Sequence, residues 1–227
     1  MRPFTERLSP TIRNIVVVQA VMFGLYIMAS GLRFPISAHL ALGPAFALGE
    51  LWQPATSLFV HVDAWSFIFD LIGLWFVGAT IERAMGLRRF LLLFFGVGLA
   101  ANLTIALLGV ALGQPGMAAG CGDSVLALFV ALGVLYGPSQ VRVWGQLVLP
   151  ARLLTGILVG MSVLAGLMQG AWASLGGTLV AVGLGFLLAG GKVQSIVILA
   201  ARLLRKRRSA FHVLDGGRKK SRDKFVN

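Results

Sequence analysis

The sequence predicts an all-α membrane protein, built as a bundle of six membrane-spanning helices with both chain ends in the cytoplasm. Hydrophobic residues make up 57% of the chain and charged residues 12%, about half of the charged share of a soluble domain. Six apolar stretches follow one another, most of them long enough to cross a bilayer. Basic residues gather in alternate connecting segments, which indicates a consistent orientation.

The N-terminal segment 1–14 carries three arginines and is predicted to lie in the cytoplasm. Ile15 to Leu32 is the first predicted span. Its length of about 18 apolar residues exceeds the core of a signal peptide, which makes a cleaved signal the less favoured alternative. Residues 33–60 contain Pro35, Pro44 and Pro54, and are expected to lie along the membrane interface because proline interrupts a spanning helix.

The remaining spans are separated by glycine, proline and basic residues, and the fourth is short. They are predicted at Val62–Ile81, Phe90–Leu112, Gly120–Tyr136, Leu147–Met168 and Ala171–Ala189. Residues 15–190 thus form the membrane domain, and 191–227 form a basic cytoplasmic tail. A cluster in this tail is predicted to bind anionic lipid: Arg205, Lys206, Arg207 and Arg208. The tail lacks interleaved aromatic residues, so nucleic acid is not an expected partner.

Charge placement fixes the predicted orientation. With the N-terminus inside, Arg33 alone of the 20 Lys and Arg residues falls in an outer segment. Such an excess of inner basic residues is the usual determinant of topology. The chain has one cysteine, Cys121, which excludes an internal disulfide.

Polar residues within or beside the spans need a reason, because they are costly in a bilayer. Asp63, Ser66 and Asp70 are spaced three and four apart in the second span, so they are expected to share one helix face. Cys121, Asp123 and Ser124 begin the fourth span. Two explanations stay open: mutual hydrogen bonding across the bundle, or a water-filled cavity that opens outward.

Four segments carry a family resemblance. The second span contains His61, Ser66 and Asp70, and closes with Glu82-Arg-Ala-Met-Gly86. The fourth opens Gly120-Cys-Gly-Asp-Ser124, and the sixth contains Ala173-Ser-Leu-Gly-Gly177. In order and spacing, from Trp52 to Gly190, these segments resemble the rhomboid intramembrane proteases. That family has His-x4-His-x3-Asn with Glu-Arg-x-x-Gly, then Gly-x-Ser-Gly-Ala, then Ala-His-x-Gly-Gly.

The resemblance implies that the catalytic groups are replaced. In the family, a serine of the fourth span attacks the peptide carbonyl and a histidine of the sixth span accepts its proton. The second-span histidine and asparagine hold the oxyanion. The matching positions here are Gly122, Ser174, Ser66 and Asp70, and only His61 is retained. Glycine offers no nucleophile and a carboxylate repels an oxyanion, so no catalytic residue is expected.

The resemblance therefore favours a non-catalytic rhomboid-like protein of a bacterial inner membrane. It would bind the transmembrane helix of a partner protein as a scaffold, a chaperone or a subunit of a membrane complex. No cofactor or metal is expected. Residues predicted to line the former site are His61, Ser66, Asp70, Cys121, Gly122, Asp123, Ser124 and Ser174.

Two alternatives remain. The first is an active serine-type intramembrane endopeptidase with an atypical site, in which Cys121 or Ser124 works with a histidine or an aspartate. A hydroxyl or thiol hydrogen-bonded to a histidine inside the cavity would overturn the non-catalytic prediction. The second is proton or ion handling through Asp70 and Asp123, because intramembrane acids often mark ion paths.

Overall fold

A computed structural model of the chain describes residues 9–43, 46, 49–113, 117–143 and 147–190. They belong to one compact unit that ends at Gly191. Five helical segments in this part of the chain are long and apolar enough to cross a membrane, and a sixth apolar helix is shorter. The predicted lipid-binding cluster Arg205–Arg208 lies outside the described residues.

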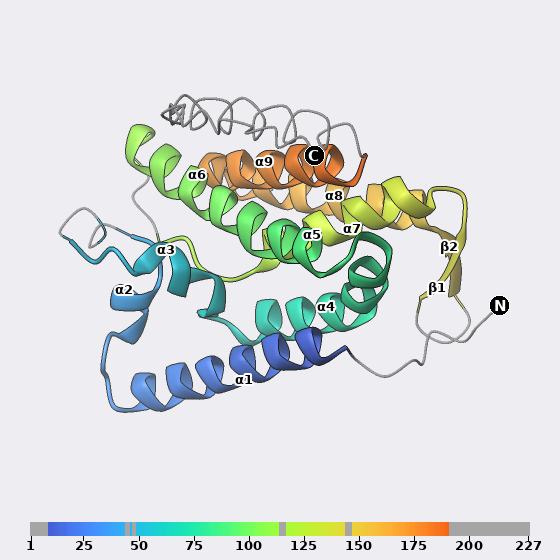
Figure 1. The fold of residues 1–227 in the computed structure, drawn as a ribbon. Helices are drawn as coiled ribbons and strands as arrows, with labels where there is room; N and C mark the ends of the chain where they lie inside the picture. The colour runs from blue at the N-terminus through green and yellow to red at the C-terminus, as the bar shows by residue number, and fades with distance from the viewer. Residues whose placement is uncertain (1–8, 44–45, 47–48, 114–116, 144–146, 191–227) are drawn as a thin grey trace, which may run out of the picture. The chain divides into compact units, whose positions relative to one another are not determined.

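Helix α1 (Pro10–Gly31) runs beside α4 (Ala64–Met85), as Figure 1 shows. It begins five residues before the predicted span, because Ser9 caps the backbone N–H of Ile12 and a proline follows in the first turn. The hydroxyls of Ser9 and Thr11 both donate to the carboxylate of Glu82, near the end of α4. These two hydrogen bonds link the start of α1 to the end of α4.

The segment 33–60, predicted to lie at the membrane interface and called the interfacial segment below, contains α2 (Ile36–Leu40), α3 (Gln53–Thr56) and a 3-10 turn, Ser57–Phe59. The fully buried Gln53 organises it. Its amide nitrogen donates to the carbonyl of Ala38 (3.0 Å) and to Glu50 (2.9 Å), and its side-chain oxygen accepts from the N–H of Gly43 (3.0 Å). One side chain therefore satisfies a backbone group of α2 and one of the loop that follows it.

The third span is continuous from Leu87 to Ala111. It consists of α5 (Leu87–Leu91), a π-helical turn (Leu92–Gly96) and α6 (Val97–Ala111). Gly86 separates it from α4 with a φ of 81°, a left-handed conformation that glycine adopts without a steric penalty. The helix therefore starts directly after this glycine, three residues before the predicted start.

Helix α7 (Gly122–Tyr136) is the central element. Its 15 residues span about 22 Å, less than the roughly 30 Å hydrocarbon core of a bilayer. It packs against α4, α6, α8 (Ala151–Met168) and α9 (Trp172–Ala189), and most of its side chains are buried. Because protein surrounds it, this helix need not match the membrane thickness. Helix α9 packs on both α6 and α7 (Figure 1).

The predicted start of the fifth span at Leu147 is wrong. Strand β2 (Leu147–Pro150) pairs antiparallel with β1 (Gln140–Val143), and α8 begins only at Ala151. The short apolar sequence Leu147-Val-Leu149 suits either structure. Pro150, at the end of β2, holds an extended conformation and forms the boundary with the helix.

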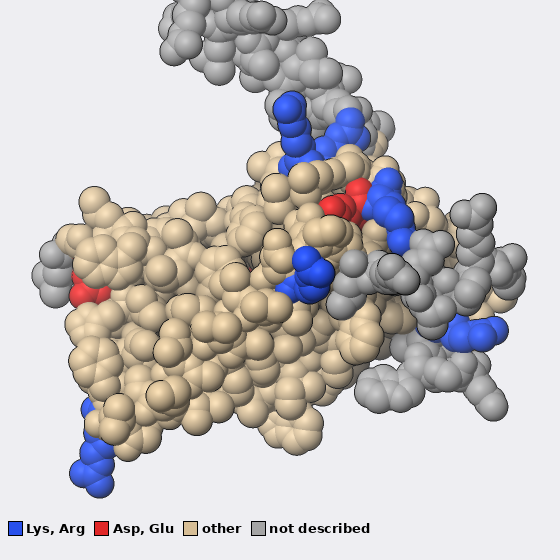
Figure 2. Space-filling view, turned by 60° about the horizontal axis from the view of Figure 1, so that its bottom comes forward, with Lys and Arg blue, Asp and Glu red and all other residues tan. Residues whose placement is uncertain are grey.

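The surface is divided by charge. On the face in Figure 2, a broad uncharged area lies between a small charged group at one end and most of the basic side chains toward the other. The helices also expose many large apolar side chains, such as Trp65 and Trp75 on α4 and Met161 on α8. A surface of this kind suits contact with lipid rather than with water.

Candidate functional site

The loop before α7 brings distant segments together. Ala118 forms a two-way backbone bridge with Leu42 of the interfacial segment, and the N–H of Gly120 donates to the carbonyl of Ser57 (2.9 Å). Gly120 has a φ of 94°, and a Cβ there would lie 3.7 Å from the ring of His61. The positive φ explains a glycine at this position, whereas the ring at 3.7 Å would leave room for a Cβ.

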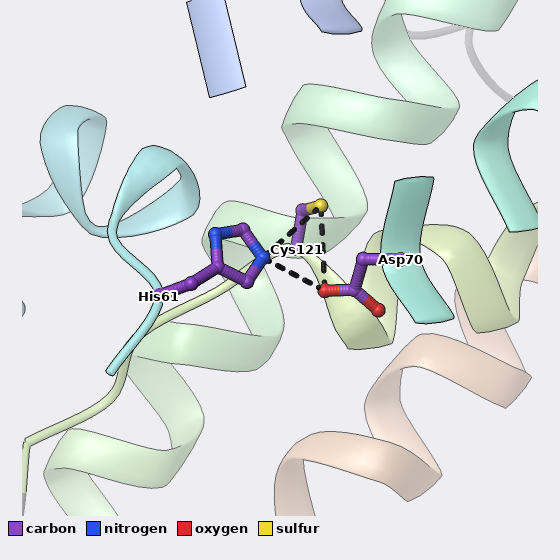
Figure 3. Close-up of side chains that lie close together, drawn as sticks. All are labelled: His61, Asp70 and Cys121. Carbon is purple, nitrogen blue, oxygen red and sulfur yellow. Dashed lines mark hydrogen bonds and ion pairs between the residues drawn. The ribbon is translucent and has the colours of Figure 1, made fainter. Parts of the chain in front are cut away.

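His61, Asp70 and Cys121 form a buried cluster that we call the HDC cluster (Figure 3). His61 precedes α4, Asp70 lies in α4, and Cys121 caps the start of α7. The Nε2 atom of His61 lies 3.0 Å from Oδ2 of Asp70 and 4.0 Å from Sγ of Cys121, and the thiol lies 3.5 Å from the same carboxylate oxygen. The exposed fractions of His61 and Cys121 are 1% each, and that of Asp70 is 9%.

Gln19 of α1 completes the surroundings of the HDC cluster. Its amide nitrogen donates to Sγ of Cys121 (3.2 Å) and to the carbonyl of Leu58 (3.1 Å), and the residue is fully buried. Sequence reasoning missed Gln19. An amide in the middle of an apolar span was the signal available, because such a group requires a partner.

A cavity of about 750 Å³ lies beside the HDC cluster. Its walls come from α4 and α8, and α7 lies between them. The lining is mainly apolar, with a few polar side chains: Asp70, Asn102, Asp123 and Ser162. Of the predicted site residues, Asp70, Gly122 and Asp123 line this cavity, and a Cβ at Gly122 would lie 3.4 Å from a carboxylate oxygen of Asp70.

Five of the eight predicted lining residues are not among those that line the cavity. His61 and Cys121 belong to the buried HDC cluster beside it, and Ser66, Ser124 and Ser174 lie elsewhere. Helix α4 begins at Ala64 with Asp63 as its cap, so Ser66 falls in an exposed first turn. Ser124 is fully buried where α7 meets Gly98 of α6. Ser174 is exposed on α9.

Two further polar residues position the site, and sequence reasoning missed both. Thr178, one turn beyond Ser174, donates to Asp123 (3.2 Å) and joins α9 to α7. Asn102 of α6 donates to the hydroxyl of Ser57 (3.1 Å) and more weakly to the carbonyl of Gly120 (3.4 Å). Each is a polar residue within an apolar span, and this pattern alone could have identified them.

The HDC cluster does not have the geometry of a catalytic triad. In a triad, one ring nitrogen of the histidine faces the nucleophile and the other faces the orienting acid. Here the thiol and the carboxylate both approach Nε2 of His61, while Nδ1 is buried without a hydrogen-bond partner among the described residues. The thiol lies at the outer limit of hydrogen bonding to the ring and is closer to the carboxylate, which disfavours a thiolate.

Comparison with known proteins gives one family. The family model for the rhomboid domain matches residues 48–191. A protein named "Rhomboid protease GluP" from Bacillus subtilis (strain 168) is 33% identical over 57 residues, which cover 25% of this chain and 11% of that protein. From the same organism, "Putative rhomboid protease YdcA" is 26% identical over 106 residues, or 43% of this chain and 49% of that protein. The matches thus span about a tenth and about half of these relatives.

Proposed function

This chain belongs to the rhomboid family, and we propose that it is a proteolytically inactive member that holds the transmembrane helix of a partner protein in the cavity between α4 and α8. The family and the apolar helices make it an integral, multi-pass membrane protein. The relatives named above are called proteases. The proposal therefore rests on the residues that differ here.

The observation that carries the proposal is Gly122 at the cavity wall. The family resemblance assigns the nucleophile to this position, and a Cβ added there would lie 3.4 Å from a carboxylate oxygen of Asp70, so a side chain at this position would face that carboxylate. Asp70 presents a carboxylate to that space instead of a hydrogen-bond donor, which would destabilise a developing oxyanion. The nearest hydroxyl along α7, on Ser124, is buried and has no hydrogen-bond partner among the described residues.

The cavity supports binding of a helix. Its apolar walls include large, exposed residues of α4 and α8, such as Phe69, Ile72 and Met161. A helix that diffuses in the bilayer meets this opening without crossing a polar barrier. Asp70, Asn102 and Asp123 line the same cavity and supply polar contacts, which favours a partner helix with a hydrogen-bond donor.

We further propose six crossings, with α7 as the short fourth span and both chain ends in the cytoplasm of a bacterial cell. The excess of Lys and Arg in alternate connections supports this orientation. The Bacillus relatives support a bacterial inner membrane.

Alkaline phosphatase fusions test this topology. A fusion after Gly113 should be active, because the third span ends outside, and a fusion after Met85 should be inactive. Green fluorescent protein at the C-terminus should fluoresce. High phosphatase activity after Met85 with little after Gly113 would reverse the orientation.

We expect no proteolysis by the purified, full-length protein in liposomes. The substrate is a transmembrane helix with a destabilised outer half, and a rhomboid protease reconstituted in parallel is the positive control. Products are measured by mass spectrometry. Cleavage by the wild-type protein that disappears in Cys121→Ala would overturn inactivity and assign the thiol. Cleavage that persists in the double variant Cys121→Ala with Ser124→Ala would also overturn the proposed inactivity, and would mean that another group is the nucleophile.

Helix binding is tested by site-specific photo-crosslinking in native membranes. A photoreactive residue at Phe129, inside the cavity, should give a discrete adduct with one membrane protein. The same residue at Leu107, an exposed position on α6 outside the cavity lining, should not. Ala165→Trp, which narrows the cavity, should reduce the adduct at least fivefold, whereas Leu164→Trp, next to it and outside the lining, should not. Equal adducts at Phe129 and Leu107 would contradict the proposal.

A further inference from the structure

We propose that the HDC cluster is a binding site for a divalent transition-metal ion of the zinc type, with Nε2 of His61, a carboxylate oxygen of Asp70 and Sγ of Cys121 as ligands. This inference does not depend on helix binding by the cavity. It rests on the donor atoms, their spacing, their charge and their access to the cavity.

The three donor atoms converge on one point. They lie within 4.8 Å of one another and come from separate segments of the chain. Zinc–ligand bonds of about 2.0–2.3 Å at tetrahedral angles place neighbouring donors about 3.3–3.6 Å apart. The observed separations are 3.0, 3.5 and 4.0 Å. The three separations average close to the tetrahedral value. Shifts of the donor atoms by about 0.5 Å, through small side-chain rotations, therefore suffice to bind an ion.

Charge also favours a divalent cation. A carboxylate and a thiolate together carry two negative charges, and a neutral imidazole adds none, so a divalent ion forms a neutral complex. Neutrality matters here because the cluster is almost completely buried in a membrane protein, where an uncompensated charge is costly. Nitrogen, sulfur and oxygen donors of this kind are the ligand types that zinc binds in proteins.

The cavity leaves room for a fourth ligand. Gly120 and Gly122 line the cavity next to the HDC cluster and have no side chains to block it. A Cβ at Gly120 would lie 3.7 Å from Nε2 of His61 and 3.9 Å from Oδ2 of Asp70. Water, or a donor group on a bound helix, therefore has access to an ion at this point. Three protein ligands with one open position is a common zinc arrangement.

Gln19 is placed to support a thiolate ligand. Its N–H already donates to Sγ of Cys121, and an anionic sulfur would accept this bond more strongly than a thiol. On binding, the thiol proton leaves to water in the cavity and the imidazole proton occupies Nδ1, which frees Nε2 for the metal.

Cobalt(II) titration tests the site directly. The full-length protein is purified in mild detergent, stripped with a chelator and titrated with Co²⁺. One equivalent should produce a near-ultraviolet sulfur-to-cobalt band together with intense visible bands, which indicate four-coordination. Because Cys121 is the one cysteine in the chain, the sulfur band has a single assignment. Zn²⁺ should displace the cobalt and raise the melting temperature.

Variants separate the site from adventitious binding. Cys121→Ser should abolish the sulfur band, and His61→Ala and Asp70→Asn should each weaken metal affinity by roughly 100-fold or more, since even outer-shell changes cost about 10–100-fold. His39→Ala, which removes an exposed histidine, should have no effect. Absence of a sulfur band in the wild-type protein would overturn the proposal, and so would equal affinities of His61→Ala and His39→Ala. A zinc-dependent rise in the melting temperature of the wild type that is absent from Cys121→Ser, with circular dichroism showing that the variant is folded, would also support it.

Discussion

Replacing Gly185 with valine is expected to destabilise the membrane unit by roughly 3 kcal/mol, because forcing bulk into a closely packed contact costs about that much. At this position α9 lies directly against the backbone of α7. A Cβ on Gly185 would lie 3.2 Å from both the Cα and the carbonyl oxygen of Ala127. Backbone atoms cannot rotate away as a side chain can, so the two helices would have to separate. Such close approach through small residues is a main source of helix association in membranes.

Gly183→Val is the matched control, two residues earlier on the same helix. No atom lies within 4 Å of a Cβ built there, so stability should change by less than about 1 kcal/mol. Unfolding of both variants by a denaturing detergent, followed by circular dichroism, measures the difference. Equal stabilities would show that α9 does not approach α7 as closely as the structure places it.

Gln53→Met is expected to destabilise the interfacial segment by about 2–4 kcal/mol. Methionine keeps the size of the side chain but removes its hydrogen bonds to Ala38, Gly43 and Glu50. Buried backbone groups that lose their partners cost about 1–3 kcal/mol each, and part of the loss is recovered by rearrangement. The segment leads into Ser57 and His61, so its loosening should also reach the HDC cluster.

Hydrogen exchange measured by mass spectrometry tests this expectation. Amides of residues 36–59 should exchange faster in Gln53→Met, whereas those of α9 should keep the wild-type rate. Gln169→Met makes the same chemical change at an exposed helix end and should leave exchange in residues 36–59 unaltered. Unchanged exchange in Gln53→Met would mean that the glutamine does not organise the segment.

Hydropathy correctly located five long apolar helices and one shorter apolar helix among the described residues, because apolar composition is a local property of the sequence. It failed where structure depends on pairing. Residues 147–149 are apolar enough for a helix, and only the partner strand 140–143 makes them a strand. The π turn at Leu92–Gly96 likewise has no local signal in an evenly apolar run.

The site was predictable in part, for the same reason. The family resemblance and helical spacing indicated Asp70, Gly122 and Asp123, which do line one cavity. The same resemblance and spacing also indicated Ser66, which instead lies in the exposed first turn of α4, because the start of that helix depends on its cap. Members of the HDC cluster are separated by 9 and 51 residues along the chain, so no short sequence motif contains all three or predicts that they lie together.

The first helix changes how this protein has to be handled. The shared family segment begins at residue 48, whereas Ile12, which fills the groove over Gly78, and Gln19, which touches Cys121, come from α1. A fragment trimmed to the shared segment would expose the thiol of Cys121, the one cysteine in the sequence, and the surface of α4 around Gly78. Oxidation or aggregation of such a fragment would then result from the loss of α1. The tests above therefore require a protein that includes α1.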